Sequence, residues 1–254
     1  MTNTHRHLVR TTLLAALFLQ SSVAVAQWKA LDAETLRLDG SIEADSHDQY
    51  LKLATPSLRK VVLNSPGGYE LPAALIASDL LGRGNVDIIV DGMCASSCAN
   101  QLLPVSKRPT VNCGSLLAWH GSRVLAKPEP ESLHDDGYPP DIVEKQVAWW
   151  SRLNRLTMAA YEANGISASI LRDSVVAAAG IEPETATTYS FNETTGGISV
   201  SESSSAVAWI PTRSILQTYG YDTSDFCPSY DDDMDASVRR IAGDLLFTKH
   251  AVDP

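Results

Sequence analysis

The chain has 254 residues, of which 44% are hydrophobic and 20% charged, and its formal net charge is −10. This composition supplies enough apolar material for the core of one domain of roughly two hundred residues. The negative charge argues against nucleic acid and anionic membrane surfaces as partners. After the N-terminal segment, no stretch approaches the ~20 consecutive apolar residues that a membrane-spanning helix needs.

The first 26 residues have the three features of a secretory signal peptide. Arg6 and Arg10 provide positive charge, Leu13–Val25 is mostly apolar, and Ala24–Ala26 is a small-x-small cleavage site. A buried N-terminal helix is the alternative structure for this segment. We expect cleavage after this site, a single mature domain over residues 27–254, and a periplasmic or secreted location.

Strands and helices alternate through the first half of the mature chain. Leu36–Ile42 has the alternation of a strand, and Val61–Leu63 is a β-branched run typical of a buried parallel strand. A helix is expected from Tyr69 to Gly82 or Gly84, because apolar residues recur there at helical spacing. This alternation predicts an α/β fold with a parallel sheet and crossover helices. The other elements expected here are a helix over Asp45–Ser57, a strand over Val86–Val90 closed by Asp91-Gly92, and a helix beginning at Ser96.

The second half is expected to contain longer helices and two irregular segments. Residues 127–140 hold four prolines and several acids, which predicts a surface loop. Residues 180–206 are polar and predict a long loop or a polar hairpin, the kind of insertion that often has a function. The remaining expected elements are strands over Thr110–Cys113, Leu116–Trp119 and Val207–Ile210, and helices over Ile142–Asn164, Ser167–Ala179, Pro211–Tyr219 and Asp235–Thr248.

The four cysteines, Cys94, Cys98, Cys113 and Cys227, predict two disulfides in an exported protein. Three pairings are open on sequence alone. A zinc site is the alternative, but the spacings contain no paired C-x-x-C ligands, so no metal is expected. The acidic run Asp231–Asp233 is expected to be a solvated face, because it lacks the glycine and terminal glutamate of a calcium-binding loop.

The centre of the chain contains the groups that acyl transfer needs. Gly67-Gly68 follows a strand and can aim a backbone N–H into a cleft, although a simple tight turn explains it equally well. Ser96 lies in a run of small residues between strand and helix, where it fits a nucleophile or a helix N-cap, and Ser97 fits either role. His120 ends an apolar strand, as a general base or as a core histidine would.

Three ordered motifs in this region resemble a known family. Ser65-Pro66-Gly67-Gly68 is followed by Gly92-Met93-Cys94-Ala95-Ser96-Ser97-Cys98-Ala99, and then by the apolar strand that ends at His120. Their order and spacing resemble the Clp protease proteolytic subunit and the wider Clp/crotonase superfamily, which includes signal peptide peptidase A. The similarity covers roughly residues 36–179 and returns at Ile215–Gly220. It implies a Clp/crotonase-like α/β fold of repeated β-β-α units, with a mainly parallel sheet and flanking helices.

The resemblance also implies roles for individual residues. Ser96 would be the nucleophile and His120 the base, and the N–H groups of Gly68 and Ser97 would form the oxyanion hole. The third residue of the family, an aspartate shortly before the terminal helix, has no counterpart over Ser203–Trp209. Asp173 is the candidate acid in the preceding helix, and Glu202 is the nearest acid in the polar insertion.

Two departures from the family lie beside the nucleophile. Cys94 and Cys98 stand where the family has small residues, and we expect them to anchor the turn by disulfides to Cys113 or Cys227. A cysteine nucleophile is the alternative use of these thiols.

Together these features predict an exported serine hydrolase, in particular a peptidase that cleaves peptides or unfolded segments without ATP or any cofactor. The absent aspartate favours the alternative, a non-catalytic Clp-like binding or scaffold module of the cell envelope. A crotonase-type acyl-CoA enzyme is a third interpretation, although export would separate it from its cofactor. The expected partners are a peptide or protein substrate and, by resemblance to rings and trimers of this fold, further copies of the chain; no nucleic acid or membrane span is expected.

Overall fold

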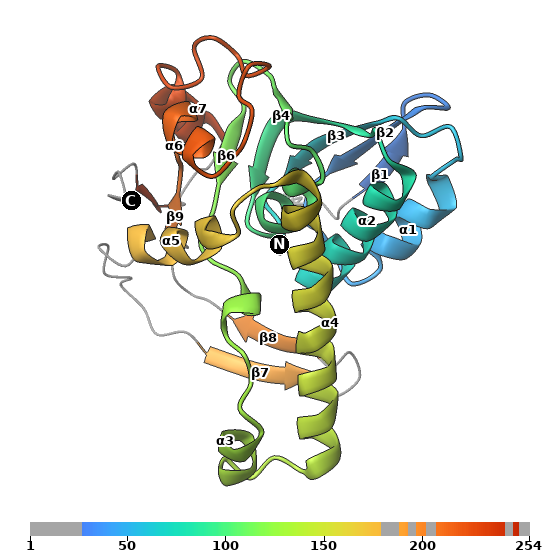
Figure 1. Ribbon diagram of the computed structural model, residues 1–254, viewed down its shortest axis with the longest axis vertical. Coiled ribbons are helices and arrows are strands. Elements are labelled where there is room, and N and C mark those ends of the chain that lie inside the picture. The colour runs from blue at the N-terminus through green and yellow to red at the C-terminus, as the bar shows by residue number, and fades with distance from the viewer. Residues whose placement is uncertain (1–26, 179–187, 193–196, 202–206, 242–245, 249–254) are drawn as a thin grey trace, which may run out of the picture.

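The structure is a computed structural model that describes residues 27–178, 188–192, 197–201, 207–241 and 246–248. The predicted signal peptide and Glu202 lie outside these residues. The described part has an α/β architecture, in which helices pack against a mixed, mostly parallel sheet (Figure 1). The predicted fold class is confirmed at this level.

A six-stranded sheet lies at the centre of the described part. Its strands are β1 Gln27–Ala30, β2 Thr35–Asp39, β3 Lys60–Ser65, β4 Asp87–Ala95, β5 Thr110–Val111 and β6 Leu116–Ala118. The strand order is β1-β2-β3-β4-β5, and β6 pairs with the C-terminal part of β4. Strand β1 is antiparallel to β2, and the other pairings of this sheet are parallel. The carboxyl ends of β3, β4 and β6 therefore meet at one edge, where α/β proteins commonly bind ligands.

Helices connect the strands and cover the sheet (Figure 1). Helix α1 Ser46–Leu53 packs against β1 and α2, and α2 Glu70–Arg83 links β3 to β4. The long helix α4 Pro140–Asn164 packs against α2 and extends beyond the sheet toward the short helix α3 Pro130–Asp135. The other α-helices are α5 Ser169–Ala178, α6 Arg213–Thr218 and α7 Met234–Ile241.

The sequence of β3 and α2 explains why these elements form. Val61 and Leu63 are fully buried, because β3 runs between two parallel neighbours and is covered on both faces. On α2 the buried face includes Ala73, Ala74 and Ile76, whose small or aliphatic side chains allow close packing. The helix ends at Gly84, which has a φ of 62°.

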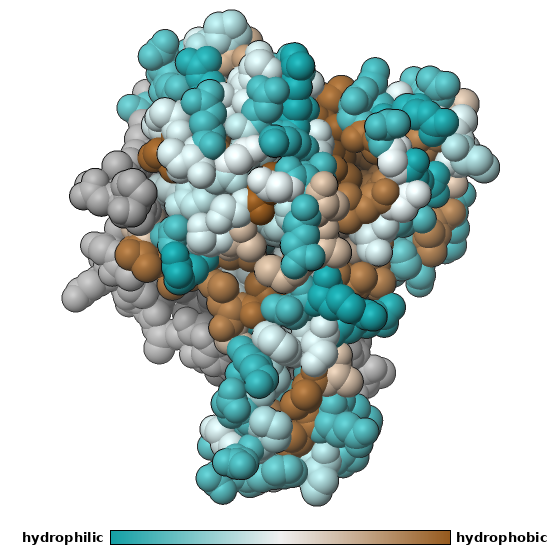
Figure 2. Space-filling model, in the orientation of Figure 1, coloured by the Kyte–Doolittle hydropathy of each residue, from teal (hydrophilic) through white to brown (hydrophobic). Residues whose placement is uncertain are grey.

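Helix α4 buries one stripe of its surface along its length. Leu153 and Tyr161 are fully buried, whereas Trp149 and Trp150 are half-buried. In the face shown in Figure 2, hydrophobic surface gathers over α2 and along the lower, protruding part of α4. The Trp150 indole N–H donates to the Arg123 carbonyl at 3.2 Å, so α4 also braces the chain after β6.

Strand β4 is longer than predicted, and the expected end at Asp91-Gly92 is wrong. Gly92 has a φ of 127°, and the register with β3 shifts beside it. There the Met93 N–H donates to the Asn64 side chain at 3.0 Å instead of to a strand carbonyl. The strand then continues to Ala95 because it gains a new partner, β6.

The helix expected from Ser96 is short and is not a regular α-helix. It consists of a π-helical turn over Cys98–Leu102 and a 3-10 turn over Leu103–Val105. Pro104 lacks an N–H and cannot continue the hydrogen-bond ladder. A further 3-10 turn, Arg123–Leu125, follows β6.

In three other segments the structure differs from the predicted elements or decides between two predicted alternatives. The loop predicted over residues 127–140 contains α3. Within residues 180–206, β7 Thr188–Asn192 and β8 Gly197–Ser201 form an antiparallel pair, which matches the hairpin alternative. The helix expected over Asp235–Thr248 ends at Ile241, because Leu246–Thr248 instead forms strand β10 parallel to β9 Val207–Trp209.

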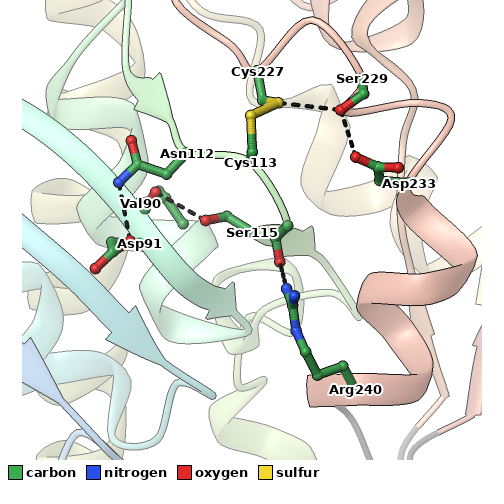
Figure 3. Close-up of a disulfide and its surroundings, with 10 residues drawn as sticks. Val90, Asp91, Asn112, Cys113, Ser115, Cys227, Ser229, Asp233 and Arg240 are labelled. Carbon is green, nitrogen blue, oxygen red and sulfur yellow. Dashed lines mark hydrogen bonds between the residues drawn. A yellow bond between two sulfur atoms is a disulfide. The ribbon is translucent and has the colours of Figure 1, made fainter.

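The prediction of two disulfides is confirmed, with the pairs Cys94–Cys98 and Cys113–Cys227. The expected link from the Ser96 turn to Cys113 or Cys227 is wrong, because Cys94 and Cys98 have Cα atoms only 5.2 Å apart and pair with each other. The second disulfide joins the segment after β5 to the C-terminal segment (Figure 3). Ser229 contacts Cys227 Sγ and donates to Asp233, so a polar network surrounds this cross-link.

The disulfides bear on the location of the protein. Disulfides persist in oxidising compartments and are rare in the cytosol, so two of them indicate a non-cytoplasmic location. None of the helices in the described ranges is long and apolar enough to cross a membrane.

Candidate active site

The first part of the site is the turn between β3 and α2. Gly67 and Gly68 have φ angles of 96° and 140°, which residues with a side chain rarely adopt. The Ile42 N–H donates to the Gly67 carbonyl at 2.7 Å, and the Tyr69 N–H donates to the Ile42 carbonyl at 2.8 Å. These bonds fix the turn against the chain that follows β2.

The second part is the turn after β4, which carries Ser96. Ser96 has a φ of 54°, in the left-handed region that costs a non-glycine residue roughly 1–2 kcal/mol. Its N–H donates to the Ala118 carbonyl at 3.0 Å, and its own carbonyl accepts from the Asn100 N–H at 2.7 Å. Such a sharp strand-to-helix turn presents a serine hydroxyl outward from the sheet edge.

The Cys94–Cys98 disulfide brackets this serine turn. Both cysteines are fully buried, one at the end of β4 and the other at the start of the π-helical turn. The cross-link joins the two arms of the turn on either side of Ser96. Both thiols are therefore consumed in a structural bond, which leaves neither cysteine as a nucleophile in this oxidised form.

The third part is His120, directly after β6. The Nε2 atom of its exposed side chain lies 2.6 Å from the Ser96 Oγ atom. In the tautomer protonated on Nδ1, Nε2 accepts the serine hydrogen, the arrangement of a nucleophile and its base. The preceding residue, Trp119, exchanges two backbone hydrogen bonds with Trp209, at 2.9 and 2.6 Å.

The two N–H groups expected to hold an oxyanion differ in their surroundings. The Gly68 N–H donates to Ser97 Oγ at 3.1 Å, and the Ser97 hydroxyl donates to the Gly68 carbonyl at 2.5 Å. An oxyanion at Gly68 would therefore have to share or displace this hydroxyl. The Ser97 N–H begins the helical turn, where no helical carbonyl is available to it. Ser97 itself is fully buried, and within the described ranges its hydroxyl is hydrogen-bonded to Gly68 and not to His120. This hydroxyl therefore stabilises the glycine turn.

Hydrogen bonds hold the segment after His120 from two further directions. The Asn100 Nδ2 atom donates to the Gly121 carbonyl at 2.6 Å, and the Gly121 N–H donates to Ser174 Oγ at 2.9 Å. Asn100 belongs to the turn after Ser96, whereas Ser174 belongs to α5. The backbone beside the histidine is thus tied both to the serine turn and to α5.

Asp173 lies on α5 beside Ser174 but takes part in a different network. Its Oδ2 atom accepts from the Tyr219 hydroxyl at 2.9 Å, and its Oδ1 atom accepts from Arg172 Nε at 3.0 Å. Burial, and then the neighbouring Asp173, raise the pKa of Tyr219 to about 12. No hydrogen bond joins Asp173 to His120 in the part of the chain that the structure describes. The geometry therefore does not bring this candidate acid to the base.

A different carboxylate, Glu70, does reach the segment that follows His120. Glu70 is the first residue of α2, and its Oε1 atom accepts from Ser122 Oγ at 2.8 Å and from the Arg123 N–H at 3.1 Å. Burial raises the pKa of the Glu70 carboxyl, while these two hydrogen bonds and the charges of Arg123 and His120 act in the opposite direction. Sequence analysis missed Glu70 because an acid in the first turn of a helix is ordinarily explained by the helix dipole.

The raised pKa of Glu70 predicts a pH-dependent contribution to stability. This contribution is fully present below the unfolded value, near 4.5, and is lost as the pH rises through the folded value. We therefore expect the unfolding free energy of Glu70→Gln, minus that of the wild type, to grow between pH 4 and pH 7.5. Urea unfolding at several pH values measures the difference, and a difference that is constant or falls with pH would contradict this assignment.

His120 is exposed, and Ser96 is half-buried. Two clefts of the protein lie elsewhere, one of about 810 Å³ lined in part by Lys60, Lys107 and Arg108, and one beside the Cys113–Cys227 disulfide. Neither is lined by Ser96 or His120. Among the residues that the structure describes, no group of three His, Cys, Asp or Glu side chains is placed to hold a metal ion.

Comparisons with known proteins do not assign a function to this geometry. No protein-family model matches the chain, and no characterised protein matches it at significant similarity.

Proposed function

We propose that the protein is a serine hydrolase, and specifically a peptidase that acts on peptides or unfolded segments. The observation that carries this proposal is the 2.6 Å contact between Ser96 Oγ and His120 Nε2, made by a serine held in a left-handed turn. The left-handed conformation of Ser96 costs stability. The Cys94–Cys98 disulfide and the backbone hydrogen bonds of Ser96 offset this cost. The peptide specificity in this proposal comes from the resemblance of the three sequence motifs to the Clp protease proteolytic subunit.

The proposed reaction follows from the positions of these groups. Ser96 Oγ attacks the substrate carbonyl carbon while its proton passes to His120 Nε2. The oxygen that becomes negative is held by the Ser97 N–H and by the Gly68 N–H, once the latter is released from Ser97 Oγ. The C–N bond then breaks as His120 gives its proton to the leaving amine. Water, deprotonated by His120, releases the acyl group from Ser96 and restores the hydroxyl.

A non-catalytic module that binds peptides or envelope proteins is the second candidate function. Two observations favour it: the Gly68 N–H is already bonded to Ser97 Oγ, and no carboxylate is hydrogen-bonded to His120 within the described ranges. Losing the acid of a catalytic triad can lower kcat by about 10⁴. The site would then keep the shape of a hydrolase while binding a chain without cleaving it.

Reaction with a fluorophosphonate probe separates the two functions. We expect the wild type to be labelled on Ser96, as mass spectrometry of the labelled peptide would show, and Ser96→Ala to remain unlabelled. Ser151→Ala is the matched control, because Ser151 is an exposed serine on α4 and its loss should leave labelling unchanged. Labelling that survives Ser96→Ala would exclude Ser96 as the nucleophile. A folded wild type that is not labelled would support the binding module.

We also propose that residues 1–26 are a cleavable signal peptide that delivers the protein to the periplasm or outside the cell. The two disulfides support this delivery. The Clp/crotonase-like fold belongs to the same proposal. It is supported by parallel strands β3, β4 and β6, whose carboxyl ends bring the three sequence motifs together.

A further inference from the structure

The Glu70 carboxylate lies between the two halves of the candidate site. It begins the helix that follows Gly67-Gly68, so its backbone position is set by the glycine turn. Its side chain crosses to the segment after β6, where Oε1 accepts from Ser122 Oγ and from the Arg123 N–H. One carboxylate therefore connects the proposed oxyanion turn to the chain that immediately follows His120.

The two oxygens of this carboxylate have different surroundings. The Oε2 atom is buried and has no hydrogen-bond partner among the described residues. A buried acceptor without a partner costs about 1–3 kcal/mol, and more when it is charged. The charged and titratable groups that act on Glu70 from the packed segments are Arg123 and His120. Burial favours the neutral carboxyl, whereas a positive charge on Arg123 or His120 favours the ionised form. The charge of Glu70 is therefore linked to the charge of His120.

We propose that Glu70 is the acidic positioning residue of this site, holding the segment after His120 in register and stabilising the imidazolium that forms when Ser96 loses its proton. The catalytic importance of this role rests on the proposed hydrolase function. The electrostatic effect of Glu70 on His120 does not depend on that function. Glu70 acts from the N-terminus of α2, and its tether passes through Ser122 and Arg123. Glu70, on α2, thus takes the role that sequence analysis assigned to Asp173 on α5.

The protonation of His120, followed by NMR, tests the electrostatic half. We compare the wild type with Glu70→Gln, which keeps an oxygen acceptor for Ser122 and Arg123 but removes the charge. The matched control is Asp173→Asn, which removes the charge of the rival acid. The His120 resonance is assigned by its absence in His120→Gln.

In Glu70→Gln the midpoint of the His120 titration is expected to fall by about 0.5–1 pH unit, because the neighbouring anion is gone. In Asp173→Asn it is expected to stay within about 0.2 pH unit of the wild type. A midpoint that moves in Asp173→Asn and not in Glu70→Gln would overturn the proposal.

The rate of fluorophosphonate labelling tests the positioning half. We expect Glu70→Gln to react about 10- to 100-fold more slowly at pH 7.5, a smaller loss than the ~10⁴ for an acid bonded directly to the base. Should Glu70→Gln fail to fold, Ser122→Ala removes one of the two donors and leaves the charge, and it should slow labelling without moving the His120 midpoint. Wild-type rates in these folded variants would overturn the positioning role. A wild type that is not labelled would overturn the proposed function, and the titration would still decide whether Glu70 acts on His120.

Discussion

Replacing Gly67 with alanine is expected to abolish labelling of Ser96 and to lower the free energy of unfolding by about 2–5 kcal/mol. A Cβ atom at Gly67 would lie 2.5 Å from Ser96 Cβ, 2.6 Å from the Ala95 carbonyl oxygen and 2.8 Å from the Ser97 N atom. All three belong to the serine turn, so the turn cannot keep its position if the side chain is present. The left-handed conformation of Gly67 adds roughly 1–2 kcal/mol, and forced overpacking adds roughly 1–3 kcal/mol.

Gly82→Ala is the matched control for this change. Gly82 lies inside α2, and a Cβ atom there would have no neighbour within 4 Å. Alanine is a better helix former than glycine, so this variant should be more stable than the wild type by about 0.5–1 kcal/mol and should be labelled normally. Urea unfolding and the rate of labelling check both variants. Equal behaviour of the two would contradict the close approach of the glycine turn to Ser96.

Removing the Cys113–Cys227 disulfide is expected to cost about 4–5 kcal/mol of stability. The cross-link closes a loop with a sequence separation of 114 residues, and the loss of chain entropy on closing a loop grows with its length. Because folded domains are stable by only about 5–15 kcal/mol, Cys113→Ala/Cys227→Ala is expected to be close to its stability limit. Urea unfolding of the oxidised wild type and the double variant measures the difference.

The Cys94–Cys98 pair is the natural comparison, because it spans only 4 residues in sequence. The same model gives about 2 kcal/mol for so short a loop. Cys94→Ala/Cys98→Ala should therefore unfold at higher urea than the long-loop variant. The Cys94→Ala/Cys98→Ala variant should nonetheless show the larger loss in the rate of fluorophosphonate labelling, because it releases the turn that carries Ser96. A reversed order in either measurement would contradict these roles.

Local pattern was sufficient to predict the elements that lie between Leu63 and Val90. The β-branched run of β3 is buried on both faces, and the helical spacing of α2 ends at a glycine, as expected. The continuation of β4 beyond Gly92 could not be predicted, because it depends on pairing with β6, a strand that comes later in the chain. The same limit applies to Leu246–Thr248, whose strand conformation comes from its neighbour β9.

The candidate site shows the same division between local and distant contacts. Sequence analysis singled out Ser96 and His120, and the structure brings them within 2.6 Å. The residue pattern alone left Ser96 and Ser97 open, and Ser96 was assigned by the family resemblance. The structure adds that the Ser97 hydroxyl is buried against Gly68. Sequence analysis named Asp173 and missed Glu70, because only the packed structure shows that the Glu70 side chain reaches the segment after His120.

The pairing of Trp119 with Trp209 also bears on the order in which the site can assemble. The glycine turn, the serine turn and Glu70 all belong to the part of the chain that leaves the ribosome first. The backbone of Trp119, next to the proposed base, gains its two hydrogen bonds only when the segment containing Trp209 has been synthesised and has docked. A nascent chain that has not reached this segment lacks the support beside His120. The alignment of base and nucleophile is thus expected to be among the last events of folding.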